Sequence, residues 1–428
     1  MNRIISVIGE ESIITPSPGP VTSPSVTPTE DGEIKVTNPD VKNGIAETSI
    51  SATAITNAIN TSVVDGDSGF KIATAKIPAI DGVNEYRIKL PAEAFNASKP
   101  DAKIRIITQV AQIDLPNNML SNDEFSGENL IISVSEVDKT KLSEEVADKI
   151  GDRPVISINA YNENRKITWN NNDAPVTVSI KYQLKGIERI SDEFLTVWYI
   201  DDDGNCYPIT NARYDLKTGC ITFNITHFST YAVVYSRIKF KDLAKHNWAR
   251  LSIEIMASKG AITGVAPDRY DPAAYITRAD YIQFIVSTLD LHADFIDNFS
   301  DVDVNSYYYN AIGIAKKLGI IEGIGNNKFA PESHITRQDM MVITANALKY
   351  AKGLVDGSEE ELAAFADSED ISSYARKAVA ALVKSGIIVG SGGKIYPLNN
   401  TTRAEAAVIM YRLYNIEPSE LENVQKKN

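Results

Sequence analysis

The N-terminal half of the chain alternates apolar and polar residues with a period of two. Between Val176 and Leu184 every second residue is apolar or aromatic, and the residues between them are polar. This alternation is typical of a β-strand with one buried face. Other stretches with strand character span residues 86–90, 103–110, 130–137, 195–200, 220–226 and 231–235. Many short strands separated by turn signals predict β-sandwich-like modules.

A hairpin turn and a short helix are expected within this region. Residues 201–205 (DDDGN) lie between two candidate strands, and Asp, Asn and Gly favour hairpin turns. Residues 141–150 have helical character and end at Gly151. A boundary at this helix gives a β-rich module over residues 33–152 and a β-sandwich-like module over residues 153–236.

From residue 239 onward the apolar period becomes helical, and three stretches repeat one another. Each contains a Phe, an Asp two residues later, and an Arg that follows a Thr 38 residues after the Phe. The three Phe are separated by 59 and then 66 residues. A spacing that is constant inside units and variable between them indicates one folded module used three times. The three Phe-Asp pairs are Phe240 with Asp242, Phe299 with Asp301, and Phe365 with Asp367, and the three Arg are Arg278, Arg337 and Arg403.

Each repeat is predicted to contain two helices joined by a loop. The first helix ends at a glycine suited to left-handed backbone, namely Gly260, Gly319 or Gly386. The second begins after Thr277, Thr336 or Thr402, each with an acidic residue three positions later, which is a capping box. We expect repeats over residues 237–295, 296–361 and 362–418, followed by a polar tail over residues 419–428.

The repeated Arg is the candidate binding group of each unit. The capping box places it at the first position of the second helix, where the helix dipole is positive. A guanidinium beside free backbone amides favours a carboxylate or a phosphate. The alternative is a structural ion pair between each Arg and the nearby Asp of the Phe-x-Asp motif.

The three units resemble S-layer homology domains, which hold secreted bacterial proteins to the cell wall. The first unit carries FKDL, GAITG and ITRAD, the second FSDV, GIIEG and ITRQD, and the third FADS, GIIVG and TTRAE. The resemblance spans residues 239 to about 415. It implies an all-α pseudo-threefold bundle whose grooves bind a secondary cell-wall polysaccharide, often pyruvylated. The β region is similar to modules that precede such anchors in clostridial-type surface proteins.

The resemblance also implies the site residues. The predicted polysaccharide-binding residues are Asp242, Trp248, Gly264, Arg278, Asp301, Tyr307, Gly323, Arg337, Asp367, Tyr374, Gly390 and Arg403. The later units have tyrosine where the first has Trp248, and tyrosine can also stack on sugar. We therefore expect a non-enzymatic protein of the cell surface that can self-associate in a surface layer. The alternatives are the anchor of a larger secreted enzyme such as a glycoside hydrolase, and a scaffold or adhesin whose β modules bind a partner.

Composition and the absence of known motifs narrow the possible partners and cofactors. The net charge of −13 argues against nucleic acid as a partner, and no apolar run approaches the length of a membrane span. The sequence contains no catalytic or metal-binding motif, so we expect no cofactor and no metal. Cys206 and Cys220 could face each other on neighbouring strands, either as a disulfide or as two half-buried thiols.

The N-terminal residues have a composition of their own. Residues 1–32 are rich in Pro, Ser and Thr and are expected to form an extended linker. The apolar run at the start is too short for a secretory signal, so we expect a truncated beginning.

Overall fold

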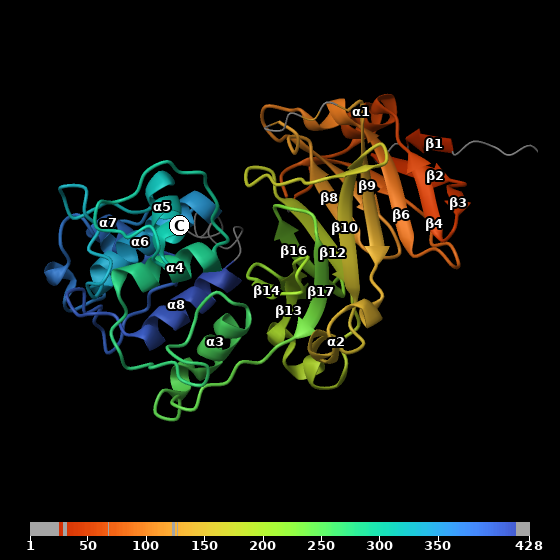
Figure 1. Cartoon of the computed structure of the whole chain (residues 1–428). Helices are drawn as coiled ribbons and strands as arrows, with labels where there is room; N and C mark the ends of the chain where they lie inside the picture. Colours follow the sequence, from red (N-terminus) through yellow and green to blue (C-terminus); the bar gives the residue numbers. More distant parts are fainter. Residues whose placement is uncertain (1–24, 29–31, 67, 122–124, 126, 417–428) are drawn as a thin grey trace, which may run out of the picture.

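The computed structural model describes residues 25–28, 32–66, 68–121, 125 and 127–416. The polar tail over residues 419–428 lies outside the described residues, as does the expected linker over residues 1–32 except for residues 25–28 and 32. A β-rich half and a helical half lie side by side and are joined near residue 236 (Figure 1).

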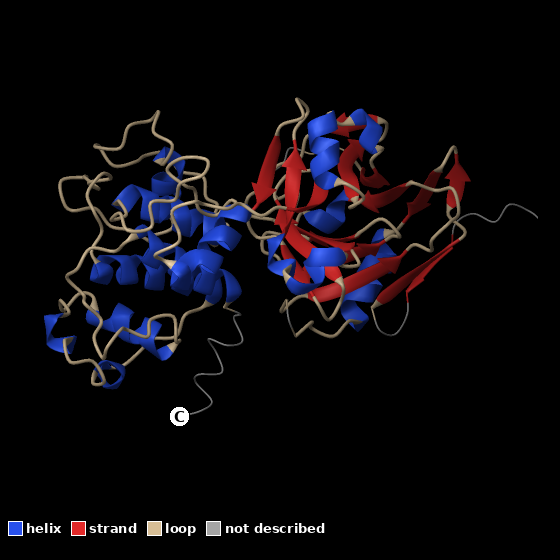
Figure 2. Ribbon diagram, turned by 90° about the horizontal axis from the view of Figure 1, so that it is seen from below, coloured by secondary structure: helices blue, strands red, loops and turns tan. Residues whose placement is uncertain are grey.

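The β-rich half consists of two sheets (Figure 1, Figure 2). The first has the order β1 (Ser25–Pro28), β2 (Glu33–Thr37), β5 (Lys71–Lys76), β7 (Ala102–Ile107), β8 (Gln112–Pro116), β12 (Val176–Lys181), β16 (Cys220–Ile225), β15 (Arg213–Asp215). The second has the order β14 (Cys206–Ile209), β13 (Leu195–Ile200), β17 (Thr230–Tyr235), β10 (Val155–Asn162), β9 (Asn129–Glu136), β6 (Glu85–Pro91), β4 (Ile45–Ser49), β3 (Asp40–Lys42), and β11 (Arg165–Ile167) pairs with β10. Residues 25–28 of the expected linker therefore form an edge strand.

The two sheets share one hydrophobic core. It contains residues from both sheets, with Trp169, Tyr86 and Tyr231 among the largest fully buried side chains. Both sheets take strands from either side of residue 152, because β9 pairs with β10 and β8 pairs with β12. The boundary expected at residues 152 and 153 therefore does not separate two cores.

Helix α1 (Ala52–Thr61) interrupts the strands, although period-two reasoning gave no helix there. It buries Ala54, Ile55 and Ala58, and the side chain of Ser51 accepts a hydrogen bond from the amide of Ala54 as an N-cap. The strands around it pair in parallel, β2 with β5, β5 with β7, and β4 with β6. Parallel pairing requires a crossover connection, and α1 is part of the connection from β2 to its parallel partner β5.

Two local predictions in the β half are confirmed. Helix α2 (Glu144–Ile150) ends at Gly151, whose φ is 61°. Residues 201–205 form the turn between β13 and β14, where the Asp201 side chain accepts the amides of Asp203 and Asn205.

The two cysteines do not face each other on neighbouring strands. Cys206 lies in β14 of the second sheet, and Cys220 lies in β16 of the first. Both are free thiols. Cys206 and Cys220 are therefore not joined by a disulfide in this structure.

The helical half contains two helices in each repeat. They are α3 (Asn247–Ser258) and α4 (Arg278–Thr288), α5 (Tyr309–Lys317) and α6 (Arg337–Lys352), and α7 (Arg376–Lys384) and α8 (Arg403–Asn415). All three repeats contribute to one hydrophobic core, which includes Phe240, Phe299 and Phe365. The glycines after the first helices, Gly260, Gly319 and Gly386, have φ values of 75°, 69° and 74°, which confirms the predicted left-handed ends.

Short 3₁₀ segments occur in both halves. They are η1 (Ala92–Phe95), η2 (Lys139–Lys141), η3 (Gly186–Ile190), η4 (Asp192–Phe194), η5 (Glu359–Leu362) and η6 (Ser368–Asp370).

The segments before the second helices bond to one another in a closed cycle. The amide of Ile276 donates to the carbonyl of Thr401 at 3.0 Å, that of Thr401 to Ile335 at 3.0 Å, and that of Ile335 to Ile276 at 3.2 Å. Each repeat therefore contacts both of the others through backbone.

The two halves meet at a buried lysine. Lys259, at the end of α3, is 2% exposed, and its Nζ donates to the carbonyls of Leu195 at 2.5 Å and Ala212 at 2.8 Å. The hydroxyl of Tyr414 donates to the same Ala212 carbonyl at 2.6 Å. A Cβ on Gly260 would lie 2.3 Å from Pro208 of the β half, so this close approach of the two halves requires glycine.

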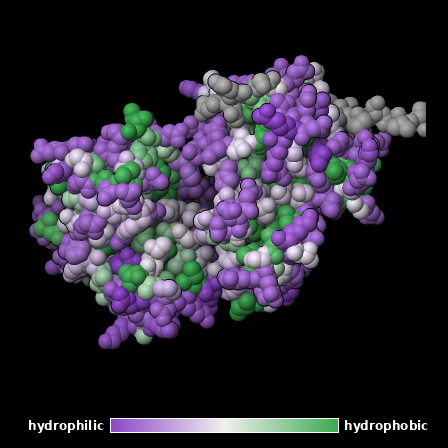
Figure 3. All heavy atoms as spheres, in the orientation of Figure 1, coloured by the Kyte–Doolittle hydropathy of each residue, from purple (hydrophilic) through white to green (hydrophobic). Residues whose placement is uncertain are grey.

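The surface seen in Figure 3 is largely hydrophilic, with small scattered hydrophobic patches.

Candidate functional site

The aspartates of the Phe-x-Asp motifs hold a turn within their own repeat. The two carboxylate oxygens of Asp301 accept the amides of Phe329 and Ala330, both at 2.8 Å. Asp242 accepts the amides of Tyr270 and Asp271, and Asp367 those of Ile395 and Tyr396. Both oxygens of each carboxylate are therefore used by backbone.

These amides also set the charge state of two of the carboxylates. Burial raises the pKa of the Asp301 carboxyl, but backbone hydrogen bonds, with those from Phe329 and Ala330 the largest, and the charge of Lys328 together hold the pKa below its usual value. The pKa of Asp367 is lowered in the same way, by the amides of Ile395 and Tyr396 against its burial.

Each repeated Arg reaches the same turn from a different repeat. The Nε of Arg278 donates to the carbonyl of Phe329 at 3.0 Å, although Phe329 belongs to the second repeat. The Nε of Arg337 donates to Ile395 at 2.8 Å, and that of Arg403 to Tyr270 at 3.0 Å. A single residue in each turn thus binds the Asp of its own repeat and the Arg of the preceding one.

The predicted alternative, an ion pair between each Arg and a Phe-x-Asp carboxylate, is not formed among the described residues. Two of the Arg pair instead with the acidic residue three positions after a helix-capping Thr. Arg337 lies 2.7 Å from Glu405, and Arg403 lies 3.5 Å from Asp280. The capping Thr accepts the amide of that acidic residue in all three repeats, whereas the reciprocal capping box is complete only for Thr402 and Glu405.

The exposed aromatic residues form a second feature of the site. Trp248, Tyr307 and Tyr374 are 60%, 68% and 59% exposed. The hydroxyl of Tyr374 donates to Asp339 at 2.6 Å, and that of Tyr307 donates to Asp280. Burial and the Asp339 carboxylate raise the pKa of Tyr374 to about 12, so it remains a hydrogen-bond donor at neutral pH.

The structure thus brings predicted residues from different repeats together. We define the Arg278 cluster as Arg278, Asp339 and Tyr374, and the Arg403 cluster as Arg403, Asp280 and Tyr307. The members of each come from all three repeats and are connected by hydrogen bonds, an ion pair or charge interactions. The Arg337 cluster contains Arg337 and Glu405. The sequence predicted only a helix-capping role for Asp280, Asp339 and Glu405. Their position two residues after the helix-starting Arg was a signal that they could also belong to the binding site.

The predicted glycines pack against the Phe of the same repeat. A Cβ on Gly264, Gly323 or Gly390 would lie 2.6, 2.8 or 2.7 Å from the ring of Phe240, Phe299 or Phe365. The absence of a side chain at these positions therefore permits close packing of the turn on the ring.

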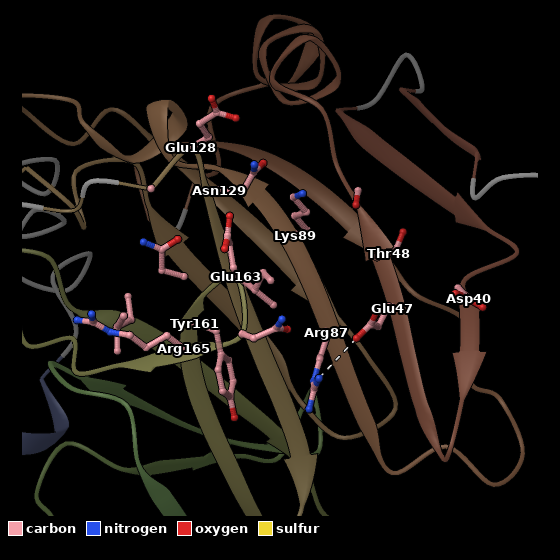
Figure 4. Close-up of a pocket in the computed structure, with 16 residues that line it drawn as sticks. Asp40, Glu47, Thr48, Arg87, Lys89, Glu128, Asn129, Tyr161, Glu163 and Arg165 are labelled. Atoms are coloured by element: carbon pink, nitrogen blue, oxygen red, sulfur yellow. Dashed lines mark ion pairs between the residues drawn. The ribbon is translucent and has the colours of Figure 1, made fainter.

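A separate hollow lies on the outer face of the second sheet (Figure 4). It has a volume of about 1100 Å³ and is lined mostly by polar side chains from β4, β6, β9, β10 and β11. Arg87 lies 5.7 Å from the centre of the Tyr161 ring and 3.5 Å from Glu47. This hollow is a second candidate binding surface.

The described residues contain neither a metal-binding cluster nor a membrane-spanning helix. No group of three or more His, Cys, Asp or Glu residues in that part of the chain could hold a metal ion. No helix in it combines the length and the apolar character of a membrane span.

Comparison with known proteins identifies the repeats. The S-layer homology domain matches residues 239–282, 298–341 and 364–407. The chain is 38% identical over 223 residues to an amylopullulanase of Thermoanaerobacterium thermosulfurigenes, covering 51% of this chain and 12% of that protein. It is 37% identical over 185 residues to the exoglucanase XynX of Acetivibrio thermocellus, covering 42% of this chain and 17% of that protein. It is 30% identical over 189 residues to the surface-layer 125 kDa protein of Lysinibacillus sphaericus, covering 43% of this chain and 16% of that protein.

These comparisons indicate a protein of the bacterial cell surface. It carries three S-layer homology domains in its C-terminal half, as the sequence predicted, and they place it at the cell wall. It spans between 12% and 17% of the length of the three relatives named above.

Proposed function

We propose that the helical half anchors the chain non-covalently to the cell wall by binding a secondary polysaccharide that carries pyruvate ketals. The observation that carries this proposal is the Arg278 cluster, in which a guanidinium and an exposed aromatic ring lie beside the same carboxylate, Asp339. A guanidinium suits the carboxylate of a ketal, and a ring suits the C–H face of the sugar. Self-association in a surface layer belongs to the same proposal.

We infer that the three repeats form a pseudo-threefold bundle. The cycle of backbone bonds among Ile276, Ile335 and Thr401 supports it, as do the matching contacts of Arg278, Arg337 and Arg403. In such a bundle the Arg, the acidic residue and the aromatic ring of one site come from three successive repeats. The same rule assigns Trp248 to the Arg337 cluster, and α3, which carries Trp248, packs against α8, which carries Glu405.

The predicted site residues then take two roles. Arg278, Trp248, Tyr307 and Tyr374 are positioned for contact with glycan, whereas Arg337 and Arg403 already pair with Glu405 and Asp280. Asp242, Asp301 and Asp367 support the turns, because their carboxylate oxygens accept backbone amides. Gly264, Gly323 and Gly390 let those turns pack on the phenylalanine rings.

Replacing the three exposed rings tests the anchor without removing core side chains. In the variant Trp248→Ala, Tyr307→Ala, Tyr374→Ala, we expect the protein to move from the pellet to the supernatant when it is sedimented with purified sacculi. The control replaces Tyr350 by Ala, because Tyr350 is also exposed, at 57%, but lies outside these clusters. Retention of the triple variant on sacculi would contradict a role for the rings.

The β half is proposed to act as a stalk or display unit without catalytic activity. One observation favours a second candidate, capture of a soluble partner: the polar hollow around Arg87 and Tyr161. Loss of a captured protein or glycan in the variant Tyr161→Ala would support it, and equal retention by variant and wild type would count against it. The relatives named as glycoside hydrolases support a third candidate, the anchor of a longer secreted enzyme.

A further inference from the structure

The guanidinium groups of the three repeated arginines differ in how many partners they have inside the protein. All three donate Nε to a turn carbonyl. Only the terminal nitrogens remain for a carboxylate, and their partners are not the same in the three clusters. We infer that the Arg278 cluster is the site that takes the acidic group of the glycan. This inference rests on the proposed function and adds which of the three sites is used.

Arg403 is saturated by internal partners. One terminal nitrogen donates to the carbonyl of Thr263 at 2.6 Å, and the other lies 3.5 Å from Asp280. The residue is 6% exposed. A ligand carboxylate would have to displace these groups, so this Arg holds the bundle together.

Arg337 is neutralised by its own carboxylate partner. Its Nη1 donates to Glu405 at 2.7 Å, and its side chain is 13% exposed. A second carboxylate would bring a like charge beside Glu405, which is unfavourable in a poorly hydrated site.

Arg278 carries a positive charge that no carboxylate within the described residues pairs. Neither of its terminal nitrogens has a hydrogen-bond or ion-pair partner in that part of the chain. Burial lowers the pKa of Arg278, with the charge of Asp339 opposing that effect. A partly buried guanidinium with two open donor nitrogens matches a carboxylate in geometry and in charge.

The Arg278 and Arg337 clusters differ by one methylene group in their acidic residue, whereas in the Arg403 cluster the aspartate Asp280 lies within 3.5 Å of the guanidinium. Glu405 uses Oε2 for the amide and hydroxyl of Thr402 and extends Oε1 to Arg337. The shorter Asp339 accepts the hydroxyl of Thr336 on Oδ2 and that of Tyr374 on Oδ1, so both of its oxygens are occupied. Asp339 therefore fixes the Tyr374 ring beside Arg278 instead of neutralising the guanidinium.

This arrangement selects a sugar that carries a carboxylate at its edge. The carboxylate of a pyruvate ketal would accept from the two terminal nitrogens of Arg278. The sugar ring would lie against Tyr374, which is 59% exposed. Removal of the ketal would leave the guanidinium unpaired, so a ketal-free glycan is expected to bind more weakly at this site.

Titration calorimetry of the full chain with polysaccharide released from sacculi of the source bacterium tests the inference. We expect Arg278→Gln to weaken binding by about tenfold or more, since two charge-assisted hydrogen bonds are lost. The matched variant Arg337→Gln should stay within about threefold of wild type, because it removes an internal pair. Thermal unfolding of each variant shows that the fold is kept.

The two kinds of failure are distinguishable. Weakened binding in Arg337→Gln with full binding in Arg278→Gln would overturn the choice of site and leave the anchoring function intact. Binding of wild type to neither the released polysaccharide nor sacculi would overturn both.

Exchange of the acidic residues gives a second test. Glu405→Asp should free Arg337 and raise the number of ketal-dependent sites from one to two, while Asp339→Glu should pair Arg278 internally and abolish ketal-dependent binding. An unchanged number of sites and an unchanged affinity in both variants would contradict the inference.

Discussion

At the scale of single residues, one turn position in each repeat connects two repeats. Phe329 donates its amide to Asp301 of its own repeat and accepts Arg278 of the preceding repeat at its carbonyl. The Phe329 ring also packs on Phe299 with centroids 5.4 Å apart. Side chains distant in sequence therefore depend on one residue for their positions.

Replacing Asp301 by Asn tests the role of the turn. Asn offers one acceptor oxygen where Asp301 offers two, so one of the amides of Phe329 and Ala330 loses its partner. We expect a loss of about 1–3 kcal/mol in the free energy of unfolding, measured in urea. Glu322→Gln, at an exposed position, serves as the control and should change it by less than about 0.5 kcal/mol. Equal stability of the two variants would count against a structural role for Asp301.

The same carboxylates predict an acid-sensitive fold. The folded pKa values of Asp301 and Asp367 lie below their usual value. Their contribution to stability is therefore complete above the unfolded pKa of about 3.8 and is lost as the pH falls through the folded pKa. Melting temperatures measured from pH 6 to pH 2 should fall more steeply for wild type than for Asp301→Asn. Parallel curves would contradict the assignment.

At the scale of elements, the starts of the second helices could be predicted because their signals are local. Thr277, Thr336 and Thr402 each precede an apolar-periodic helix and act as N-caps. Helix α1 was not predicted from the sequence, because few of its residues face the core and the residues around it alternate as they do in strands. Local signals thus fix helix ends, whereas a short helix between parallel strands depends on the sheets that cover it.

The capping residues give a matched prediction. Replacing Thr336 by Ala removes the hydroxyl that accepts the amide of Asp339 and should cost about 1 kcal/mol. Replacing Thr402 by Ala should cost about the same, because each hydroxyl accepts the amide and donates to the carboxylate of the acidic residue three positions later. Chemical denaturation measures both losses, and a loss at one position without a loss at the other would contradict the prediction.

At the scale of the whole molecule, a buried lysine joins the halves. Lys259 donates to Leu195 and Ala212 across the junction, and burial lowers its pKa to about 7. The unfolded chain then binds more protons between about pH 7 and the usual lysine pKa of about 10.4, so stability should rise with pH across that range. Lys259→Met should flatten this rise, whereas Lys245→Met, at an exposed position, should not. Equal slopes in wild type and Lys259→Met would contradict the junction's role.

The arrangement of the whole molecule was the least accessible from sequence. The triplicate spacing predicted the repeats, but it could not show that Arg278 reaches the turn of the next repeat. Strand alternation predicted two β modules, but the pairing of β8 with β12 and of β9 with β10 unites their strands. Contacts between distant segments decide both features, and periodicity reports only the segment itself.

The central claim is that the helical half binds acidic groups on a polysaccharide of the cell wall. Its most direct test is sedimentation of the full chain with sacculi before and after mild acid removal of pyruvate ketals. We predict that the protein pellets with untreated sacculi and stays in the supernatant with ketal-free sacculi. Equal pelleting with both would contradict the account.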